Sequence, residues 1–425
     1  MKKKKAPLVR RMKEFVKTSV VWGPLDHNLF FTIIFLNVYG IIMVYSASYN
    51  NSITKNYSYF MNNQLKNVIF GFVIMIVASY VNYHRIVRLG WGWFWLLAAV
   101  AIIAALKTPL AHSELGATRW IKLGPVSFQA AEPIKAAIII FFAYYVSYWG
   151  LNRWYNQLLA CLLAIALLGF LFFFSNNLST VIVLFCICAV IILSSVKKPD
   201  LYWYFLLGLA LIIIAAIFVT VYLLMHQGAE NFRFVRIRAW LHPEEYVADE
   251  GLQAMQARYA IGAGGFWGKG LGQSLIKFKL SYSYNDFILA IICEELGVFG
   301  VIVMMTLFGY LLYRIYKIAQ NAWDIEGKVL AIGVFTQIAL QLLINVMVVT
   351  SVIPTTGVTL PFFSAGGTSV VFLLAELGMV LNVDKYAKER RFFEEAERHV
   401  AQMEQRGGIG AAGWRRRLDS ARTRR

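Results

Sequence analysis

Charged residues are scarce in this sequence, and acidic residues are scarcer than basic ones. Only 15% of the 425 residues are charged, with 23 Asp and Glu against 41 Lys and Arg. A soluble domain carries about a quarter charged residues and is about half apolar. The 59% hydrophobic content therefore exceeds what a soluble core absorbs, and the composition indicates an integral membrane protein.

Several sequence signatures are also missing, and each absence excludes a class of site. The sequence contains no glycine-rich loop followed by Lys and Ser or Thr, the pattern that predicts nucleotide binding. No short apolar stretch with a small-residue cleavage site follows the N-terminal lysines, so we expect the first membrane helix to act as the targeting signal. The cysteines lack metal-site or disulfide spacing, and we interpret them as small hydrophobic residues. They are Cys161, Cys186, Cys188 and Cys293.

Long uncharged hydrophobic runs fill most of the chain. A helix needs about 17 to 25 such residues to cross the hydrocarbon layer. Because lipid offers the backbone no hydrogen-bond partner, these runs predict helices. We predict an all-α polytopic membrane protein with about ten transmembrane helices and a large extracytoplasmic loop between the seventh and eighth. The expected spans are 29–48, 67–83, 89–106, 133–149, 158–174, 178–196, 201–224, 287–312, 329–349 and 368–383.

Basic residues cluster at both ends of the chain, which sets the expected orientation. Cytoplasmic flanks retain Lys and Arg, and an even number of spans places both termini in the cytoplasm. We attribute the net charge of +18 to topology and contact with membrane lipids, and expect no nucleic acid, because no folded binding module surrounds these charges. The expected parts are a basic N-terminal segment (1–27), a membrane domain (28–383) and a basic flexible tail (384–425).

Three connections on the outer side are much longer than the others. They cover 107–131, 226–285 and 350–367. Loops of this length usually carry function or are disordered. Glycine, aromatic and charged residues stand at specific places in these three, which favours function.

The longest loop and the helix after it carry the most specific pattern. Gln253 and Gln256 precede a glycine-rich stretch at 261–272. Asp286 comes next and is followed directly by a Phe, and Glu-Glu-Leu-Gly stands further along at 294–297. This order resembles the SEDS family (shape, elongation, division and sporulation). The family has paired glutamines, a GG-x-x-GKG-like turn, and an aspartate and Phe at the head of a helix that continues into Glu-Glu-Leu-Gly.

Further blocks resemble the same family in the same order. They are Tyr-Ser-Ala-Ser at 45–48, Arg-Trp-Ile-Lys-Leu-Gly at 119–124, Gln-x-x-Glu-x-x-Lys at 129–135, and a Pro-x-Thr-Gly to Gly-Gly-Thr-Ser signature at 354–369. Some positions depart from the family pattern. Ala130 and Ala131 replace Pro and Ser, Tyr284 replaces His, and Ser-Asn-Asn-Leu-Ser-Thr at 175–180 replaces Gln-Pro-Asp-Leu-Gly-Thr. The last departure removes a carboxylate, so we assign no essential acid there.

The resemblance implies a peptidoglycan glycosyltransferase in the bacterial plasma membrane, with its active site facing outside. Such an enzyme polymerises lipid II into glycan strands and releases undecaprenyl pyrophosphate, in division or cell-shape maintenance. The reaction needs a base for the attacking sugar hydroxyl and cations for the departing pyrophosphate. We predict that Asp286 is the catalytic base. The alternative is an N-cap for the following helix, a role that Asn285 could also fill.

Candidate substrate-binding residues lie in or beside the outer loops. Arg119 can bind phosphate in bidentate fashion. Glu132 and Lys135 are neighbours on one helix face, where a structural ion pair is an equally good interpretation. Cations of the long loop suit pyrophosphate, although such residues more often contact solvent or lipid headgroups. The predicted set is Arg119, Lys122, Glu132, Lys135, Arg233, Arg236, Gln253, Gln256, Lys269 and Ser364.

Two further features predict the shape of the site. Glu294 and Glu295 cannot both face lipid, so we expect at least one to line the bundle interior. The prolines and glycines of 354–367 break regular helix at membrane depth, which is tolerated only where protein or a wet cavity covers the backbone. We therefore expect a central cavity that opens outward.

Partners and competing functions follow from the same resemblance. It implies lipid II and the growing glycan strand as substrates, and a class B penicillin-binding protein as a transpeptidase partner. Whether a divalent cation, Mg²⁺ or Mn²⁺, binds beside the pyrophosphate is left undecided, because no cluster of ligands in the sequence predicts such a site. The alternatives are a lipid II flippase or a non-catalytic division scaffold. A carrier would place ionisable residues at the midplane, whereas here they gather on the outer side.

Overall fold

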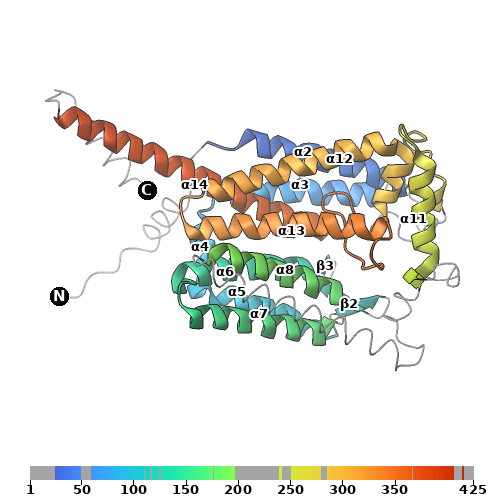
Figure 1. Cartoon of the computed structure of the whole chain (residues 1–425), viewed down its shortest axis with the longest axis horizontal. Coiled ribbons are helices and arrows are strands. Elements are labelled where there is room, and N and C mark those ends of the chain that lie inside the picture. Colours follow the sequence, from blue (N-terminus) through green and yellow to red (C-terminus); the bar gives the residue numbers. More distant parts are fainter. Residues whose placement is uncertain are drawn as a thin grey trace.

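The computed structural model describes residues 24–48, 59–109, 111–114, 117–123, 126–175, 177–196, 239–241, 250–278, 285–365, 367–405 and 414–415. Most of the long helices lie along one axis of the molecule (Figure 1). Helix α11 lies across one end of this bundle, and the C-terminal part of α14 projects from the other end. The protein is thus a bundle of membrane helices, as the composition predicts.

Apolar runs form the long helices. Among the described residues, six helices are long and apolar enough to span a membrane: α2 (His27–Ser48), α3 (Tyr59–Tyr80), α7 (Trp154–Ser175), α8 (Leu178–Ser195), α12 (Ile288–Asn321) and α13 (Ile325–Val349). The other helices are α4 (Tyr83–Val87), α5 (Trp93–Ala105), α6 (Ala131–Trp149), α11 (Glu250–Gly264) and α14 (Thr368–Gln405), with 3₁₀ turns η1 (Leu89–Gly92) and η2 (Ile276–Phe278).

Nine of the ten expected spans fall within the described residues, and a helix overlaps each of the nine. The expected span 201–224 lies outside the described residues, so the count of ten stays a prediction. Helix α14 differs from expectation because it continues to Gln405. The expected start of the tail at 384 therefore falls inside a helix.

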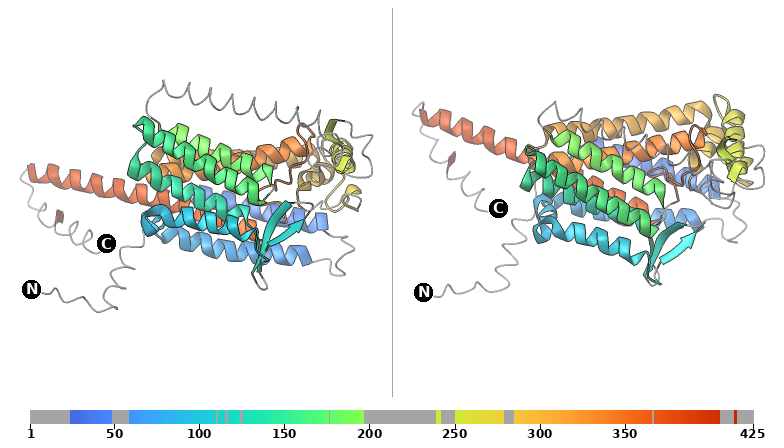
Figure 2. Two further views of the ribbon diagram at one scale, coloured as in Figure 1. Left: turned by 90° about the horizontal axis from the view of Figure 1, so that it is seen from below. Right: turned by 60° about the horizontal axis from the view of Figure 1, so that its bottom comes forward.

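A small antiparallel sheet stands where the sequence pattern predicts only a loop, at 107–131. Its strands β1 (Ala111–Glu114), β2 (Ala117–Leu123) and β3 (Val126–Gln129) are paired in the order β1-β2-β3. Successive side chains of a strand point to opposite faces, so Ile121 is buried while its neighbour Lys122 is exposed. The sheet lies toward the same end of the bundle as α11 (Figure 2).

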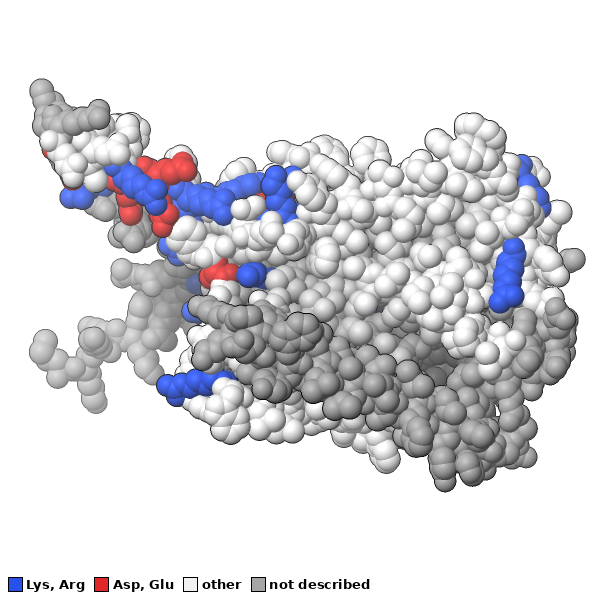
Figure 3. Space-filling view, viewed as in Figure 1, with Lys and Arg blue, Asp and Glu red and all other residues white. Residues whose placement is uncertain are grey.

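Charge is distributed as expected for a helix bundle in lipid. The visible side of the bundle is almost free of charged side chains, which gather on the projecting part of α14 (Figure 3). Phe31 and Phe35 of α2 are more than half exposed, at 53% and 59%. A large uncharged belt of this kind is suited to contact with acyl chains.

Helix α14 packs closely against α3 through small residues. A Cβ atom added to Gly378 would lie 2.5 Å from the backbone oxygen of Met75, and one added to Gly71 would lie 2.6 Å from Cδ1 of Leu374. Small residues at helix contacts let backbones approach within lipid. The contact holds the membrane part of α14 inside the bundle.

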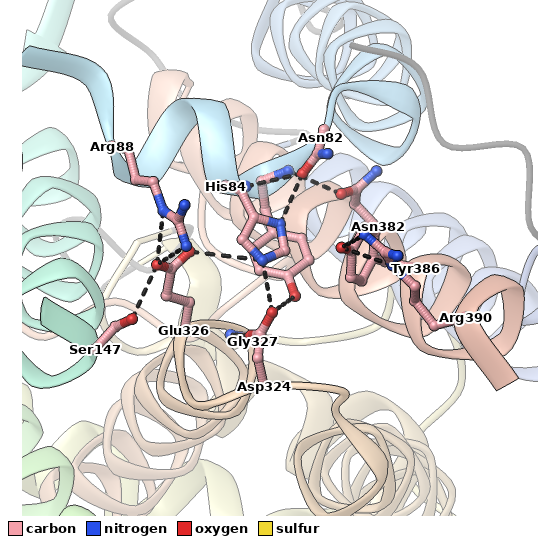
Figure 4. Close-up of polar contacts among 11 residues, drawn as sticks. Asn82, His84, Arg88, Ser147, Asp324, Glu326, Gly327, Asn382, Tyr386 and Arg390 are labelled. Atoms are coloured by element: carbon pink, nitrogen blue, oxygen red, sulfur yellow. Dashed lines mark hydrogen bonds and ion pairs between the residues drawn. The ribbon is translucent and has the colours of Figure 1, made fainter. Parts of the chain in front are cut away.

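A polar cluster joins α4, α6 and α13 at the end of the bundle from which α14 projects (Figure 4). His84 Nε2 lies 2.6 Å from Oδ2 of Asp324. Arg88 Nη2 lies 2.8 Å from Oε1 of Glu326, which also accepts a hydrogen bond of 2.9 Å from the Ser147 hydroxyl. Because these partners come from three separate helices, the cluster ties their ends together.

Candidate functional site

Asp286 stands directly before the first turn of α12. Phe287 occupies the N-cap position of this helix, so neither Asn285 nor Asp286 is the capping residue. The backbone oxygen of Asp286 accepts a hydrogen bond of 2.9 Å from Nδ2 of Asn345, and the same nitrogen donates to the oxygen of Val358 at 2.9 Å.

Ser364 fixes the same backbone from another direction. Its hydroxyl donates to the oxygen of Asn285 at 2.8 Å and accepts from the amide of Leu360 at 2.8 Å. The side chain is buried. Substrate binding by Ser364 stays a prediction, and in this structure its hydroxyl positions the residue before Asp286.

The turn that carries Ser364 has an unusual backbone. Phe362 adopts a φ of 66°, in the left-handed region that bulky residues rarely enter. Its carbonyl oxygen would lie 2.3 Å from a Cβ atom added to Gly40 of α2. The glycine therefore leaves room for this turn, as expected for a broken segment covered by protein.

Glu132 and Lys135 form a buried ion pair in the first turn of α6. Lys135 Nζ lies 2.9 Å from Oε1 of Glu132, and the two residues are 4% and 2% exposed. The pair lines a pocket between α6, α8, α13 and the segment 357–359. The polar residues of its wall are Gln129, Glu132, Lys135, Asn177, Ser179, Thr180, Gln341 and Thr359.

The pocket and the backbone of Asp286 both contact the C-terminal part of α13. Gln341 of the pocket and Asn345 are four residues apart and hence neighbours on one helix face. Val358 also lines the pocket, and it accepts from the same amide that holds the backbone of Asp286. The backbone of Asp286 thus lies beside the pocket that the Glu132–Lys135 pair lines.

The glycine-rich stretch forms a turn that packs against α12. The amide of Lys269 donates to the backbone oxygen of Glu294 at 2.9 Å, and the amide of Gly270 donates to that of Glu295 at 2.9 Å. A Cβ atom added to Gly264 would lie 1.8 Å from the oxygen of Cys293. The glycines of this stretch thus allow the backbone of the turn to approach that of α12 closely.

Glu294 and Glu295 both face the protein interior and are fully buried. Glu294 accepts from Nζ of Lys269 at 2.7 Å and from the Ser274 hydroxyl at 2.5 Å. Glu295 accepts from the Ser46 hydroxyl at 2.5 Å. The expectation that at least one of the two lines the bundle interior is confirmed.

These carboxylates balance cations of the long loop. Nζ of Lys277 lies 3.5 Å from Oε1 of Glu295, and both side chains are buried. Lys269 keeps 33% of its side chain exposed while paired with Glu294. Pyrophosphate binding by Lys269 stays a prediction, because its charge is already compensated within the protein.

The remaining predicted residues are spread over neighbouring elements. Gln253 and Gln256 lie half-buried on α11, and Oε1 of Gln256 is buried without a hydrogen-bond partner among the described residues. Lys122 is exposed on β2, which also contains Arg119. Their substrate-binding roles stay predictions. Arg233, Arg236 and the side chain of Arg119 lie outside what the structure describes.

Polar residues of α13 are absent from the predicted set although they hold the site together. Gln337, Gln341 and Asn345 are 0%, 7% and 0% exposed. Their spacing of four residues in an apolar helix places them on one face, and this signal could have identified them. The amide of Gln337 reaches Glu376 of α14, another buried residue outside the predicted set.

The described residues include no group of three or more His, Cys, Asp or Glu side chains placed to hold a metal ion. A divalent cation needs several oxygen ligands or an anionic substrate that supplies them. The Mg²⁺ or Mn²⁺ ion considered from the sequence stays a prediction.

Residues 26–389 match a family model described as "Cell cycle protein" (FTSW_RODA_SPOVE). The chain belongs to this family. It is 31% identical over 382 residues to the "Probable peptidoglycan glycosyltransferase FtsW" of Trichlorobacter lovleyi, covering 88% of this chain and 96% of the relative. It is 33% identical over 383 residues to the "Stage V sporulation protein E" of Bacillus subtilis, covering 84% and 96%.

Solved structures of similar fold agree with this family membership. A chain of a peptidoglycan synthase complex that coordinates polymerization and crosslinking superposes with a TM-score of 0.70 at 21% identity, covering 86% of this chain and 99% of that chain. The rod shape determining protein RodA of Thermus thermophilus superposes with a TM-score of 0.61 at 22% identity, covering 86% and 98%. The family's polytopic helical fold is therefore present here.

Proposed function

We propose that this protein is a peptidoglycan glycosyltransferase that polymerises lipid II into glycan strands. Relatives named as probable enzymes of this kind are 31% identical along most of both chains. The observation that carries the proposal is the placement of Asp286. Asn345 and Ser364 hold its backbone segment next to a pocket lined by the Glu132–Lys135 pair.

Each part of the proposed site has a task in the reaction. The carboxylate of Asp286 accepts the proton of the acceptor's sugar 4-hydroxyl, whose oxygen bonds to the anomeric carbon of the growing chain. The bond from that carbon to undecaprenyl pyrophosphate breaks, and the pyrophosphate leaves with the bonding electrons. Cations stabilise the charge that develops on it, and we assign this role to Lys135 and Arg119.

We infer that this end of the bundle faces the outside of the cell. The opposite end carries the cluster with His84, Arg85 and Arg88 and the charged extension of α14. Basic flanks remain on the cytoplasmic side, which places both termini there. We also propose a class B penicillin-binding protein as a partner, which would crosslink the strands that this chain makes.

The substitution Asp286→Asn tests the assignment of the base. Asn is nearly isosteric with Asp and keeps the ability to cap a helix, so folding should be retained. Removal of a general base costs about a hundredfold to ten-thousandfold in rate. The measurement is strand formation from purified lipid II by equal amounts of wild-type and variant protein, each eluting as a single species. A variant that polymerises at the wild-type rate contradicts the mechanism.

A lipid II flippase is the second candidate function. The fully buried Glu376 favours it, since carriers place ionisable groups within the membrane interior. The two candidates are separated by reconstituting the protein in vesicles that contain lipid II. Movement of lipid II across the bilayer without strand formation, even with a class B partner present, would support the flippase.

A further inference from the structure

Glu376 lies inside the bundle, on the membrane part of α14, and is 1% exposed. Its Oε2 accepts a hydrogen bond of 2.8 Å from Nε2 of Gln337. The second oxygen of each side chain, Oε1 of Glu376 and Oε1 of Gln337, is buried and has no hydrogen-bond partner among the described residues. Buried acceptors are rarely left unsatisfied. A proton on Oε1 of Glu376 would satisfy both oxygens at once.

The charges around Glu376 support the same conclusion. Among the described residues, the ionisable groups that act on it are Lys135 and Glu132 of α6, and α13 contributes the neutral amide of Gln337. Two carboxylates and one ammonium would leave an excess negative charge inside the membrane domain. An uncompensated charge at that depth is costly. A neutral Glu376 leaves the Glu132–Lys135 pair balanced.

We propose that Glu376 is a positioning residue that, while protonated, leaves Lys135 paired with Glu132 at the pocket. In this state Oε1 of Glu376 donates its proton to Oε1 of Gln337, while Nε2 of Gln337 donates to Oε2 of Glu376. Loss of the proton to water creates a second carboxylate that competes with Glu132 for Lys135. Lys135 is then drawn away from the pocket. This role of Lys135 rests on the proposed function.

The protonation state is tested without any activity measurement. Infrared difference spectra of the purified protein at neutral pH compare wild type with Glu376→Gln. We expect the variant to lack one carbonyl band of a protonated carboxyl group. Gln337→Leu should shift this band because its hydrogen bond is lost. The control Glu395→Gln makes the same change at an exposed position of α14 and should lose only ionised carboxylate signal. Loss of ionised carboxylate signal in Glu376→Gln overturns the proposal.

The positioning role is tested by the pH profile of lipid II polymerisation. Beyond the ionisation midpoint of Glu376, its protonated fraction falls about tenfold for each pH unit. We expect the wild-type rate to decline in step on the alkaline side, while Glu376→Gln, which stays neutral, declines at higher pH. Glu395→Gln should follow the wild type.

Each outcome bears on a separate claim. Parallel profiles for the wild type and Glu376→Gln overturn the positioning role, even if the infrared band is present. Absence of polymerisation by the wild type, with and without a class B partner, overturns the proposed function and with it the role of Lys135. The infrared result then still decides whether Glu376 holds a proton.

Discussion

At the scale of single residues, amide side chains rather than charges hold the proposed site together. Asn345 is fully buried and donates to two carbonyl oxygens, one from Asp286 and one from Val358. The geometry of the base therefore depends on a neutral residue that takes no part in the chemistry. A search of the sequence for catalytic side chains does not find residues of this kind.

Replacing Asn345 with Leu should lower both stability and activity. The change keeps side-chain volume but removes the donor from two backbone oxygens, which costs about 1 to 3 kcal/mol when buried groups are left unsatisfied. Thermal unfolding of the purified protein measures the first effect, and strand formation the second. Thr350→Ala serves as control, since Thr350 is exposed and bonds only within its own helix. Equal effects of the two changes would contradict the role of Asn345.

At the scale of elements, the junction between α11 and α12 depends on the absence of side chains. Gly264 ends α11 against the backbone of Cys293, and Gly297 interrupts α12 with a φ of 64°. The turn between 264 and 270 fits against α12 because Gly264, Gly268 and Gly297 carry no side chains at the contact. Displacing this turn would also displace Lys269 from Glu294.

Gly264→Ala should therefore disrupt the junction, whereas Gly262→Ala should not. The added Cβ at Gly264 would lie 1.8 Å from the oxygen of Cys293, while nothing lies within 4 Å of one at Gly262. Both positions are in the last turn of α11, so replacing Gly with Ala changes the helix propensity by the same amount at each. We expect a lower unfolding temperature and reduced strand formation for the first variant only. Similar behaviour of the two variants would refute this account.

The polar cluster of α4 and α13 predicts a loss of stability in acid. Burial acts to raise the pKa of Asp324, but hydrogen bonds from His84, the amide of Gly327 and Tyr83 outweigh it and hold the pKa below its usual value of 3.8. A carboxyl whose folded pKa is depressed stabilises the fold above its unfolded pKa and loses this contribution as pH falls through the folded value.

Acid unfolding of the wild type and Asp324→Asn measures this contribution. The wild type should lose thermal stability as the pH falls below the usual aspartate value of 3.8, whereas the variant, weaker at neutral pH, should change less over the same range. The Tyr83 hydroxyl, 2.8 Å from the carboxylate, would then lose its charged acceptor. Parallel curves for the two proteins would show that Asp324 does not control acid stability.

The sequence predicts the helical elements well because lipid imposes a simple rule on them. Uncharged runs locate the helix at each of nine expected spans. The sheet at 111–129 was not predicted, since β1 and β3 have only four residues each and their pairing with β2 is a tertiary property. Motif resemblance singled out Asp286, Glu132 and Lys135, but their relative positions come from the structure, which places the backbone of Asp286 beside the pocket of the pair. It did not reveal Glu376, whose partners come from two other helices.

At the scale of the whole molecule, the proposed orientation predicts which surfaces are accessible. Trp267, on the turn after α11, is 74% exposed, and Glu395 is exposed on the projecting part of α14. We expect a membrane-impermeant thiol reagent added to cells to label Trp267→Cys but not Glu395→Cys. Both should react in broken cells. Labelling of Glu395→Cys in intact cells would invert the orientation.

Helix α14 connects the two sides of this orientation without a break. It contains 38 residues, so it is about 57 Å long. Helix α14 contains no proline, and its one glycine, Gly378, lies in regular helical backbone, so the helix shows none of the usual causes of a sharp bend. Glu376 and the projecting segment are therefore parts of one stiff rod. A twist or pull on its free end would be transmitted to Glu376, inside the bundle, as movement of a rigid body.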